Sequence, residues 1–473
     1  MGAPATSETS ATSVAPIDPE LKRLAIAVVA GAIAVILDTT IVSVGIHQLG
    51  ESLNASVPTI QWVSTAYLLA MFVTIPLTGW AQSRLGSKRL WLLALSVFML
   101  GSMLCALAWN AESLIAFRAV QGLGGGVLMP LMTTVLMQAA QGRNLGRLMA
   151  TVSLPAALGP ILGPVLGGVI LNYLSWQWLF LINVPLGVVG LMLAIRFFPA
   201  GEPGRPVRLD LVGLLLVSPG VVGVIYGLSR AAGGGGFGQA RVPLLTGLAL
   251  IGLFGWRALR RGTAALIDVR LFRHRALTAS AALLFLTGAV LYGAMFLLPL
   301  YWQQVRGEDA LGAGLLLIPQ GIGALASRTL AGRLTDTIGG RWVAAAGFAV
   351  LALATVPFAL ATAHTSTILL MAVLLVRGFG LGAVMIPLMT GAYLGLERAE
   401  MPDASTITRI AQQLGGSFGV AVLAVILADA AGDASSLAAL ADAFDRSFWW
   451  ATAFTALAAV LSLLIPTRRT DEP

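Results

Sequence analysis

The chain has 473 residues, of which 57% are hydrophobic and only 11% are charged. Soluble domains carry about 25% charged residues, so this composition excludes a soluble protein and predicts an all-α polytopic membrane protein. The formal net charge of +8 comes from short Arg and Lys clusters between apolar stretches, a distribution that excludes a nucleic-acid-binding protein.

The first 20 residues are rich in Ala, Ser, Thr and Pro and contain no apolar segment. We expect a disordered tail (1–20) here, because a signal peptide would need a basic start and an apolar core. Apolar stretches follow, each about long enough to cross roughly 30 Å of hydrocarbon as a helix. There are fourteen of them, near residues 24–48, 59–80, 89–108, 113–138, 147–171, 177–198, 210–229, 242–259, 276–302, 311–332, 342–362, 366–393, 404–427 and 447–466.

Basic residues are distributed unequally between the two sides of these predicted spans. With the N-terminus in the cytoplasm, most of the 29 Lys and Arg residues flank the spans on the cytoplasmic side. Since cytoplasmic loops carry the excess of Lys and Arg, we expect a multi-pass protein of the cell (inner) membrane. An even number of spans puts both termini, including the tail 467–473, in the cytoplasm. Three arginines lie within spans: Arg118, Arg328 and Arg377.

Asp38, in the first span, is the only carboxylate well inside an apolar stretch. A charge at that depth costs about 2.5–3.5 kcal/mol on insertion scales, so it needs a partner, a proton or water. At a rise of about 1.5 Å per residue, Asp38 and Arg118 lie at the same depth. They can therefore pair, directly or through water. Two interpretations stay open: a static ion pair, or a switch in which a proton on Asp38 loosens its tie to Arg118.

Two sequence patterns recur eight spans apart. The link GWAQSRLGSKR, from Gly79, and the link GRLTDTIGGR, from Gly332, share a Gly at the start and a second Gly seven residues later. RAVQGLGGG begins at Arg118, and RGFGLGA begins at Arg377. Parallel repeats with a substrate site between them recur in secondary transporters. We expect two six-helix bundles (21–199 and 272–466) joined by a linker with two inserted transmembrane helices (200–271).

The fifth span repeats small residues, with Gly159, Gly163 and Gly167 at every fourth position. Small residues on one face allow close helix packing, and the neighbouring prolines bend the helix. By composition alone, this segment is a packing and kink device.

These motifs resemble the major facilitator superfamily, and within it the fourteen-span drug/proton antiporter branch. LDTTIVSVGI, QWVSTAYLLA, FRAVQGLGGG and GPILGPVLGG are similar to four signatures of that branch, in family order. The resemblance implies a major facilitator fold and proton-coupled efflux of small lipophilic or amphiphilic compounds, including drugs and antibiotics. The alternative is proton-coupled export of one particular metabolite on the same fold. Ser83 departs from the family, which has Asp at this position.

The resemblance also implies roles for particular residues. Asp38 and Arg118 would couple transport to protons. The hinge or antiporter motif would comprise Gly159, Pro160, Gly163, Pro164, Gly167 and Gly168. Cytoplasmic gating would involve Gly79, Arg84, Gly86, Arg89, Gly332, Asp336 and Arg341.

A substrate cavity is expected between the two bundles. Its candidate residues are Tyr67, Gln121, Asn183, Gln303, Gln320 and Arg377. The five uncharged candidates could equally make hydrogen bonds between helices. Arg377 could brace the second bundle through backbone carbonyls instead of facing the cavity. Arg328 lies close enough to the cytoplasmic surface for its side chain to reach out to it.

Other classes of protein fit the sequence poorly. The three His residues are well separated, and no metal-ligand cluster, nucleophile motif or nucleotide loop is present, so we expect no enzyme, no metal and no cofactor. A scaffold would leave the Asp38–Arg118 pair and the repeat unexplained. The expected partners are a small-molecule substrate, protons and the lipid bilayer, with no nucleic acid. A periplasmic adaptor is a further expectation, because the branch sometimes works with one.

Overall fold

The computed structural model describes residues 18–55, 57–140, 163, 166–199, 208–232, 236–308, 310–362, 364–431 and 436–466. Within these ranges every regular element is a helix. An N-terminal group comprises α1 (Pro19–Val44), α2 (Ile46–Ser52), α3 (Val57–Thr74), α4 (Leu77–Leu85), α5 (Ser87–Ala106), α6 (Ala111–Ala140), α8 (Trp178–Leu181) and α9 (Asn183–Phe197).

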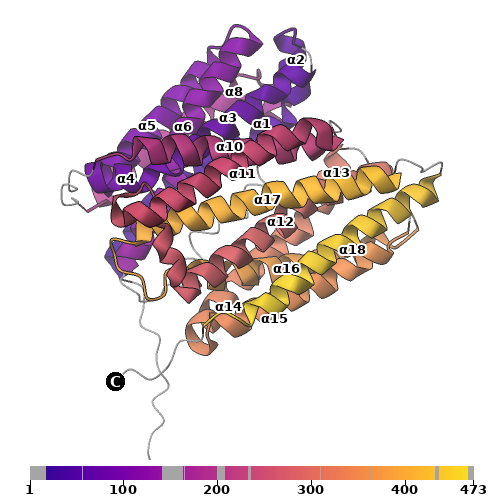
Figure 1. The fold of residues 1–473 in the computed structure, drawn as a ribbon. Coiled ribbons are helices and arrows are strands. Elements are labelled where there is room, and N and C mark those ends of the chain that lie inside the picture. The colour runs from indigo at the N-terminus through magenta and orange to yellow at the C-terminus, as the bar shows by residue number, and fades with distance from the viewer. Residues whose placement is uncertain are drawn as a thin grey trace, which may run out of the picture.

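An inserted hairpin follows, made of α10 (Leu211–Ala232) and α11 (Gly236–Arg261), with the short helices η1 (Gly262–Ala264) and η2 (Val269–Arg273) after it. The C-terminal group comprises α12 (Arg275–Gln304), α13 (Ala310–Leu316), α14 (Ile318–Ile338), α15 (Gly340–Thr355), η3 (Val356–Leu360), α16 (Thr367–Gly391), α17 (Met401–Ala431) and α18 (Leu437–Ser462). Figure 1 shows the two groups as neighbouring bundles, with α10 and α11 lying along their junction.

Several helices begin at a capping residue. Asp18 accepts a hydrogen bond from the backbone N–H of Glu20, and Pro19 occupies the first turn of α1, where its missing N–H costs nothing. The hydroxyls of Ser366 and Ser436 cap α16 and α18 in the same way. These residues stop each apolar helix from leaving its first N–H groups unsatisfied.

Ten helices of the described chain are long and apolar enough to cross a membrane, or eleven if α3 and α4 form one bent span. The helix axis turns by 57° between Trp62–Thr74 and Leu77–Leu85. Pro76 lies in this break, and proline cannot donate the hydrogen bond that would continue the helix. The expected stretch 59–80 is therefore not one straight helix. Three other expected stretches do not correspond to any of those ten helices. Stretches 311–332 and 447–466 overlap α14 and α18, and most of 147–171 lies outside the described residues.

Each group is packed within itself. In the N-terminal group, α6 lies against α3, α5 and α1, and α9 lies against α1 and α5. In the C-terminal group, α16 lies against α14, α15 and α12, and α18 lies against α15 and α12. Positions in the two groups therefore correspond: α1 to α12, α3 to α14, α5 to α15, α6 to α16 and α9 to α18.

The repeated link has the same backbone in both groups. Gly86 separates α4 from α5 with φ 76°, and Gly339 separates α14 from α15 with φ 92°. Residues with a side chain rarely adopt such angles, which explains a glycine at this point of each copy. The sequence repeat is thus also a repeat of conformation.

The inserted hairpin touches both groups, because α10 packs against α3 and α17. Its Ser218 hydroxyl donates to the carbonyl of Val73 over 3.1 Å. At the base of the hairpin, Asp210 forms an ion pair of 2.9 Å with Arg257 of α11. Burial alone would raise the pKa of Asp210, but hydrogen bonds from Arg257 and the Gly213 backbone outweigh it and hold this pKa below its usual range.

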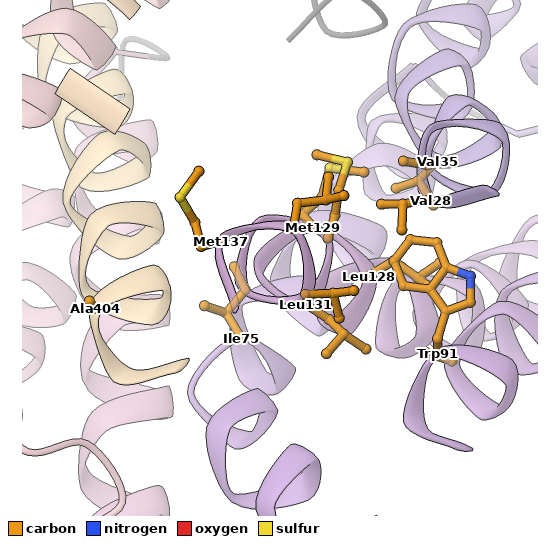
Figure 2. Close-up of a cluster of buried hydrophobic side chains, with 14 of the residues drawn as sticks. Val28, Val35, Ile75, Trp91, Leu128, Met129, Leu131, Met137 and Ala404 are labelled. Atoms are coloured by element: carbon orange, nitrogen blue, oxygen red, sulfur yellow. The ribbon is translucent and has the colours of Figure 1, made fainter. Parts of the chain in front are cut away.

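The two groups are closed against each other at the end of the molecule that contains α4, called here the α4 end. The largest hydrophobic cluster draws side chains from both groups. Figure 2 shows Ala404 of α17 across from Met137 and Ile75 of the N-terminal group. Two hydrogen bonds join the groups here: from the Ser405 hydroxyl to the Pro130 carbonyl (2.8 Å), and from the Gln138 amide to the Arg398 carbonyl (3.2 Å). The three other clusters each belong to one group alone.

Candidate functional site

The pair expected from depth along the helices is present as a direct ion pair. The Nη1 atom of Arg118, on α6, lies 2.6 Å from Oδ2 of Asp38, on α1. Asp38 is 0% exposed and Arg118 is 1% exposed. Two charges buried this deeply persist only when they are paired and further hydrogen-bonded, so their other contacts decide what the site can do.

Two amides complete the carboxylate's environment. Oδ1 of Asp38 accepts from Nε2 of Gln121 and from Nδ2 of Asn183, each over 2.9 Å. The Gln121 amide nitrogen also donates to the Ser102 hydroxyl over 2.6 Å, and its carbonyl oxygen accepts from Arg118 over 2.7 Å. Four helices, α1, α5, α6 and α9, thus contribute to one network around a single carboxylate.

The guanidinium of Arg118 is held on its other sides by neutral groups. Its Nε donates to the Val63 carbonyl over 3.2 Å. It stacks over the Tyr67 ring, 4.0 Å from the ring centroid, and lies 5.7 Å from that of Phe180. Such cation–π contacts stabilise a desolvated cation. The buried Tyr67 hydroxyl has no hydrogen-bond partner in the part of the chain that the structure describes.

This arrangement contains one group that can accept a proton without leaving its place. Protonating Asp38 would remove the negative half of the pair and leave Arg118 with neutral acceptors only. An unpaired buried charge costs several kcal/mol, so the ionised carboxylate stabilises Arg118 in this position. Among the described residues no group of three His, Cys, Asp or Glu side chains could hold a metal.

The six candidate cavity residues fall into three places. Tyr67, Gln121 and Asn183 surround the Asp38–Arg118 pair. Gln320 and Arg377 contact each other in the C-terminal group: Arg377 donates to Oε1 of Gln320 over 2.7 Å and to the Thr355 hydroxyl over 3.3 Å. Gln303 belongs to neither cluster and is exposed at the end of α12. Contact of any of them with substrate stays a prediction.

Two expectations about arginines change with the structure. Among the described residues, Arg377 donates its hydrogen bonds to side chains and not to backbone carbonyls. Arg328 is buried, with 7% of the residue exposed, and its Nε and Nη1 have no hydrogen-bond partner among the described residues.

The residues expected to form a gate lie at the α4 end. A Cβ atom at Gly79 would be 3.0 Å from Oδ1 of Asp403 and 3.5 Å from Cβ of Pro402, so α4 and the start of α17 touch at this glycine. Asp403 also accepts from the backbone N–H of Asp268 over 3.0 Å. Ser83 bonds within its own helix, to the Trp80 carbonyl. Asp403 therefore supplies the carboxylate facing this link.

The other gate candidates frame the two links. Arg84 and Arg89 are exposed on the first link, and Gly86 forms its turn. In the second link Gly332 is buried, while Asp336 and Arg341 are half-buried on either side of the turn at Gly339. These positions are compatible with a gate, whose operation stays a prediction.

Half of the proposed hinge motif can be located. Gly163 is buried against α1, where a Cβ atom would overlap Thr40, two residues after Asp38. Gly167 is buried, and Gly168 has open space beside it. Gly159, Pro160 and Pro164 lie outside the described residues.

Comparison with known proteins agrees with this architecture. The family model described as Major Facilitator Superfamily matches residues 28–420. The chain belongs to the major facilitator superfamily. It is therefore a transporter and not an enzyme, and it is a multi-pass membrane protein.

Relatives of this chain include drug-resistance proteins. A "Multidrug resistance protein B homolog" of Mycobacterium tuberculosis is 36% identical over 415 residues, which are 87% of this chain and 77% of the relative. A "Lincomycin resistance protein LmrB" of Listeria innocua is 28% identical, with 82% of each chain covered. A human organic anion transporter structure has a TM-score of 0.65 at 17% identity, covering 94% of this chain and 100% of that one, which supports the fold.

Sequence reasoning missed two contributors to these sites. Ser102 looks like any small residue in an apolar helix, and only its position opposite Gln121 shows its role. Gln121 was already a candidate, and its place beside Arg118 could have been predicted, because the two are three residues apart and hence on one helix face. Asp403 lies at the start of a span, where acidic residues are common, so its position alone did not predict a contact with the first link.

Proposed function

We propose that this chain is a proton-coupled exporter of small lipophilic or amphiphilic compounds, including drugs, that works by alternating access. The observation that carries the proposal is the buried Asp38–Arg118 pair with its amide partners. Family membership makes the chain a transporter, and the names of its relatives, which include multidrug and lincomycin resistance proteins, favour efflux of drug-like compounds.

In this proposal Asp38 carries the proton. With Asp38 ionised, the ion pair and two amide bonds hold α1 against α6 and α9. A proton arriving from outside neutralises the carboxylate, weakens its hold on Arg118 and favours the alternative packing, in which substrate and proton exchange sides. Release of the proton to the cytoplasm restores the pair, so that inward movement of protons is tied to outward movement of substrate.

The proposal includes an arrangement in the membrane. Two six-span bundles, 21–199 and 272–466, and the inserted hairpin within 200–271 give fourteen spans, with both termini on the cytoplasmic side of the cell membrane. The α4 end then faces the cytoplasm and is closed in the state described. Gly159, Gly163 and their neighbours would be the hinge. A periplasmic adaptor is the one protein partner the proposal allows.

The test is uptake of ethidium into inverted vesicles energised with a proton gradient. Wild type is compared with Asp38→Asn and with Asp210→Asn, a matched control that removes another ion-paired buried carboxylate, in the inserted hairpin. We expect Asp38→Asn to abolish gradient-driven uptake, as a protonophore does, and Asp210→Asn to keep most of it. Full gradient-driven uptake by Asp38→Asn would refute the coupling role.

The alternative is export of one endogenous metabolite by the same mechanism. The same assay distinguishes metabolite export from drug export, because a metabolite exporter would show no gradient-dependent uptake of ethidium or of other lipophilic cations in the wild type. Metabolite extracts would then replace the dye as the source of substrate.

A further inference from the structure

Glycine contacts fix which residues correspond between the two groups. A Cβ atom at Gly122 would meet the carbonyl of Tyr67, and one at Gly378 would meet the carbonyl of Gln320. A Cβ at Gly124 would lie 2.6 Å from both the Ala94 carbonyl and the Phe98 nitrogen; at Gly380 it would lie 2.8 Å from the Gly347 carbonyl and the Leu351 nitrogen. Likewise, a Cβ atom at Gly126 would meet the Thr74 hydroxyl, and one at Gly382 would meet the Ser327 hydroxyl.

This register corrects the alignment suggested by the motifs. If Gly122, Gly124 and Gly126 correspond to Gly378, Gly380 and Gly382, then Arg377 takes the position of Gln121 and not that of Arg118. The position of Arg118 is taken by Leu374, which is 0% exposed.

The neighbours of Arg377 follow the same correspondence. Gln320 stands at the position of Tyr67, and Thr355 stands at that of Ser102. The Gln121 amide donates to the Ser102 hydroxyl, and at the corresponding place Nε of Arg377 donates to the Thr355 hydroxyl. The C-terminal group thus contains a second copy of the network, with an arginine in place of its central glutamine.

In the described part of the second copy, no carboxylate is hydrogen-bonded to Arg377. In the N-terminal group the central residue donates to Asp38 of α1. The corresponding helix α12 contains no Asp or Glu, and neither do α15 and α16. Within the described chain the hydrogen-bond partners of Arg377 are the neutral oxygens of Gln320 and Thr355, and only 2% of the residue is exposed. A guanidinium has five N–H donors, and a buried one needs a counter-charge.

We propose that the transported compound supplies this counter-charge: Arg377 binds the carboxylate of an amphiphilic organic acid. A planar guanidinium holds a carboxylate through two parallel hydrogen bonds, which a hydroxyl or an amine cannot reproduce. Leu374 and Leu381 lie three residues before and four residues after Arg377 on α16, so all three share one helix face, and the two leucines give that face an apolar character. This inference rests on the proposed export function and adds amphiphiles with one acidic group to the compounds that the protein would export.

The experiment measures binding without a proton gradient, so that it does not depend on coupling through Asp38. Purified full-length protein in detergent is titrated with 1-pyrenebutyrate and with 1-pyrenebutanol, which share one apolar body and differ in charge. Energy transfer from the protein's tryptophans to pyrene reports binding. The variants are Arg377→Gln, Arg377→Lys and, as a matched control, Arg328→Gln, which removes the other buried arginine of α14–α16.

We expect wild type to bind the butyrate more tightly than the butanol. Arg377→Gln should raise the Kd of the butyrate at least tenfold and leave that of the butanol unchanged; Arg377→Lys should keep part of the preference, and Arg328→Gln all of it. The proposal is overturned if wild type shows no preference for the acid, if Arg377→Gln keeps it, or if Arg328→Gln alone removes it. Asp38→Asn should keep the preference, so a failure of proton coupling is recognised separately.

Discussion

At the scale of single residues, the Asp38 network concentrates polar contacts that an apolar bundle otherwise avoids. Each amide of the network serves more than one partner: Gln121 bridges Asp38, Ser102 and Arg118. Removing such a residue leaves several buried groups without a partner at once. The cost therefore exceeds that of losing one exposed hydrogen bond, because each orphaned polar group carries its full desolvation penalty.

We predict that Gln121→Leu lowers the free energy of unfolding by about 1–3 kcal/mol, the usual cost of leaving a buried polar group unsatisfied. The measurement is the unfolding temperature in detergent, followed by tryptophan fluorescence. Gln303→Leu is the control, since Gln303 is exposed at the end of α12 and should leave the temperature unchanged. Equal effects of the two substitutions would show that the network adds nothing to stability.

Part of this site was predictable from sequence. Two charges within apolar stretches, at equal depth by the constant rise of a helix, predicted the Asp38–Arg118 pair. The rotation of each helix about its axis is set by packing, so the identity of the carboxylate's further donors was not predictable. The register between the repeats was misjudged because each motif begins with Arg, whereas the glycine spacing that follows determines how the helices pack.

At the scale of helices, α1 carries both the proposed coupling residue, Asp38, and Thr40, which contacts the proposed hinge. Asp38 and Thr40 lie two residues apart, so they project in different directions around the helix: Asp38 faces Arg118, and Thr40 faces Gly163. A movement of α1 away from α6 must therefore change its contact with the segment around Gly163. The absence of a side chain at Gly163 lets the two backbones approach closely.

We predict that Gly163→Leu abolishes transport while membrane insertion stays normal. The leucine would overlap Thr40 and force α1 away from its neighbour, although the hydrophobicity of the segment rises. Uptake into inverted vesicles measures transport, and the amount of protein in the membrane fraction measures insertion. Gly252→Leu, in α11, is the matched control, because nothing lies within 4 Å of a Cβ there. Normal transport by Gly163→Leu would rule out a hinge at this contact.

At the scale of the whole molecule, the two groups share one hydrophobic cluster and two hydrogen bonds at the α4 end. The sequence repeat predicted the two groups, and the positive φ angles of Gly86 and Gly339 show that the repeat extends to the backbone conformation. It did not predict which end is closed, because closure depends on contacts between segments distant in the chain, such as Gly79 with Asp403. The bend at Pro76 was also missed.

We predict that a disulfide at the α4 end locks the transporter reversibly. A Cβ at Gly79 would lie 3.5 Å from Cβ of Pro402, within the range of about 3.5–4.5 Å that disulfides require. Gly79→Cys with Pro402→Cys, in a Cys105→Ala background, should cross-link on oxidation, lose uptake and regain it on reduction. Gly79→Cys alone is the control. Undiminished uptake by fully cross-linked protein would mean that this end need not open during transport.

The contact of α10 with both α3 and α17 has a consequence for traffic through the lipid. A lipophilic molecule dissolved in the bilayer can enter a two-bundle transporter sideways, between neighbouring helices of different bundles. On this flank α10 lies between α3 and α17, and its Ser218 hydroxyl donates a hydrogen bond to the Val73 carbonyl of α3. In the proposed exporter, the inserted hairpin would therefore block sideways entry of a substrate between α3 and α17.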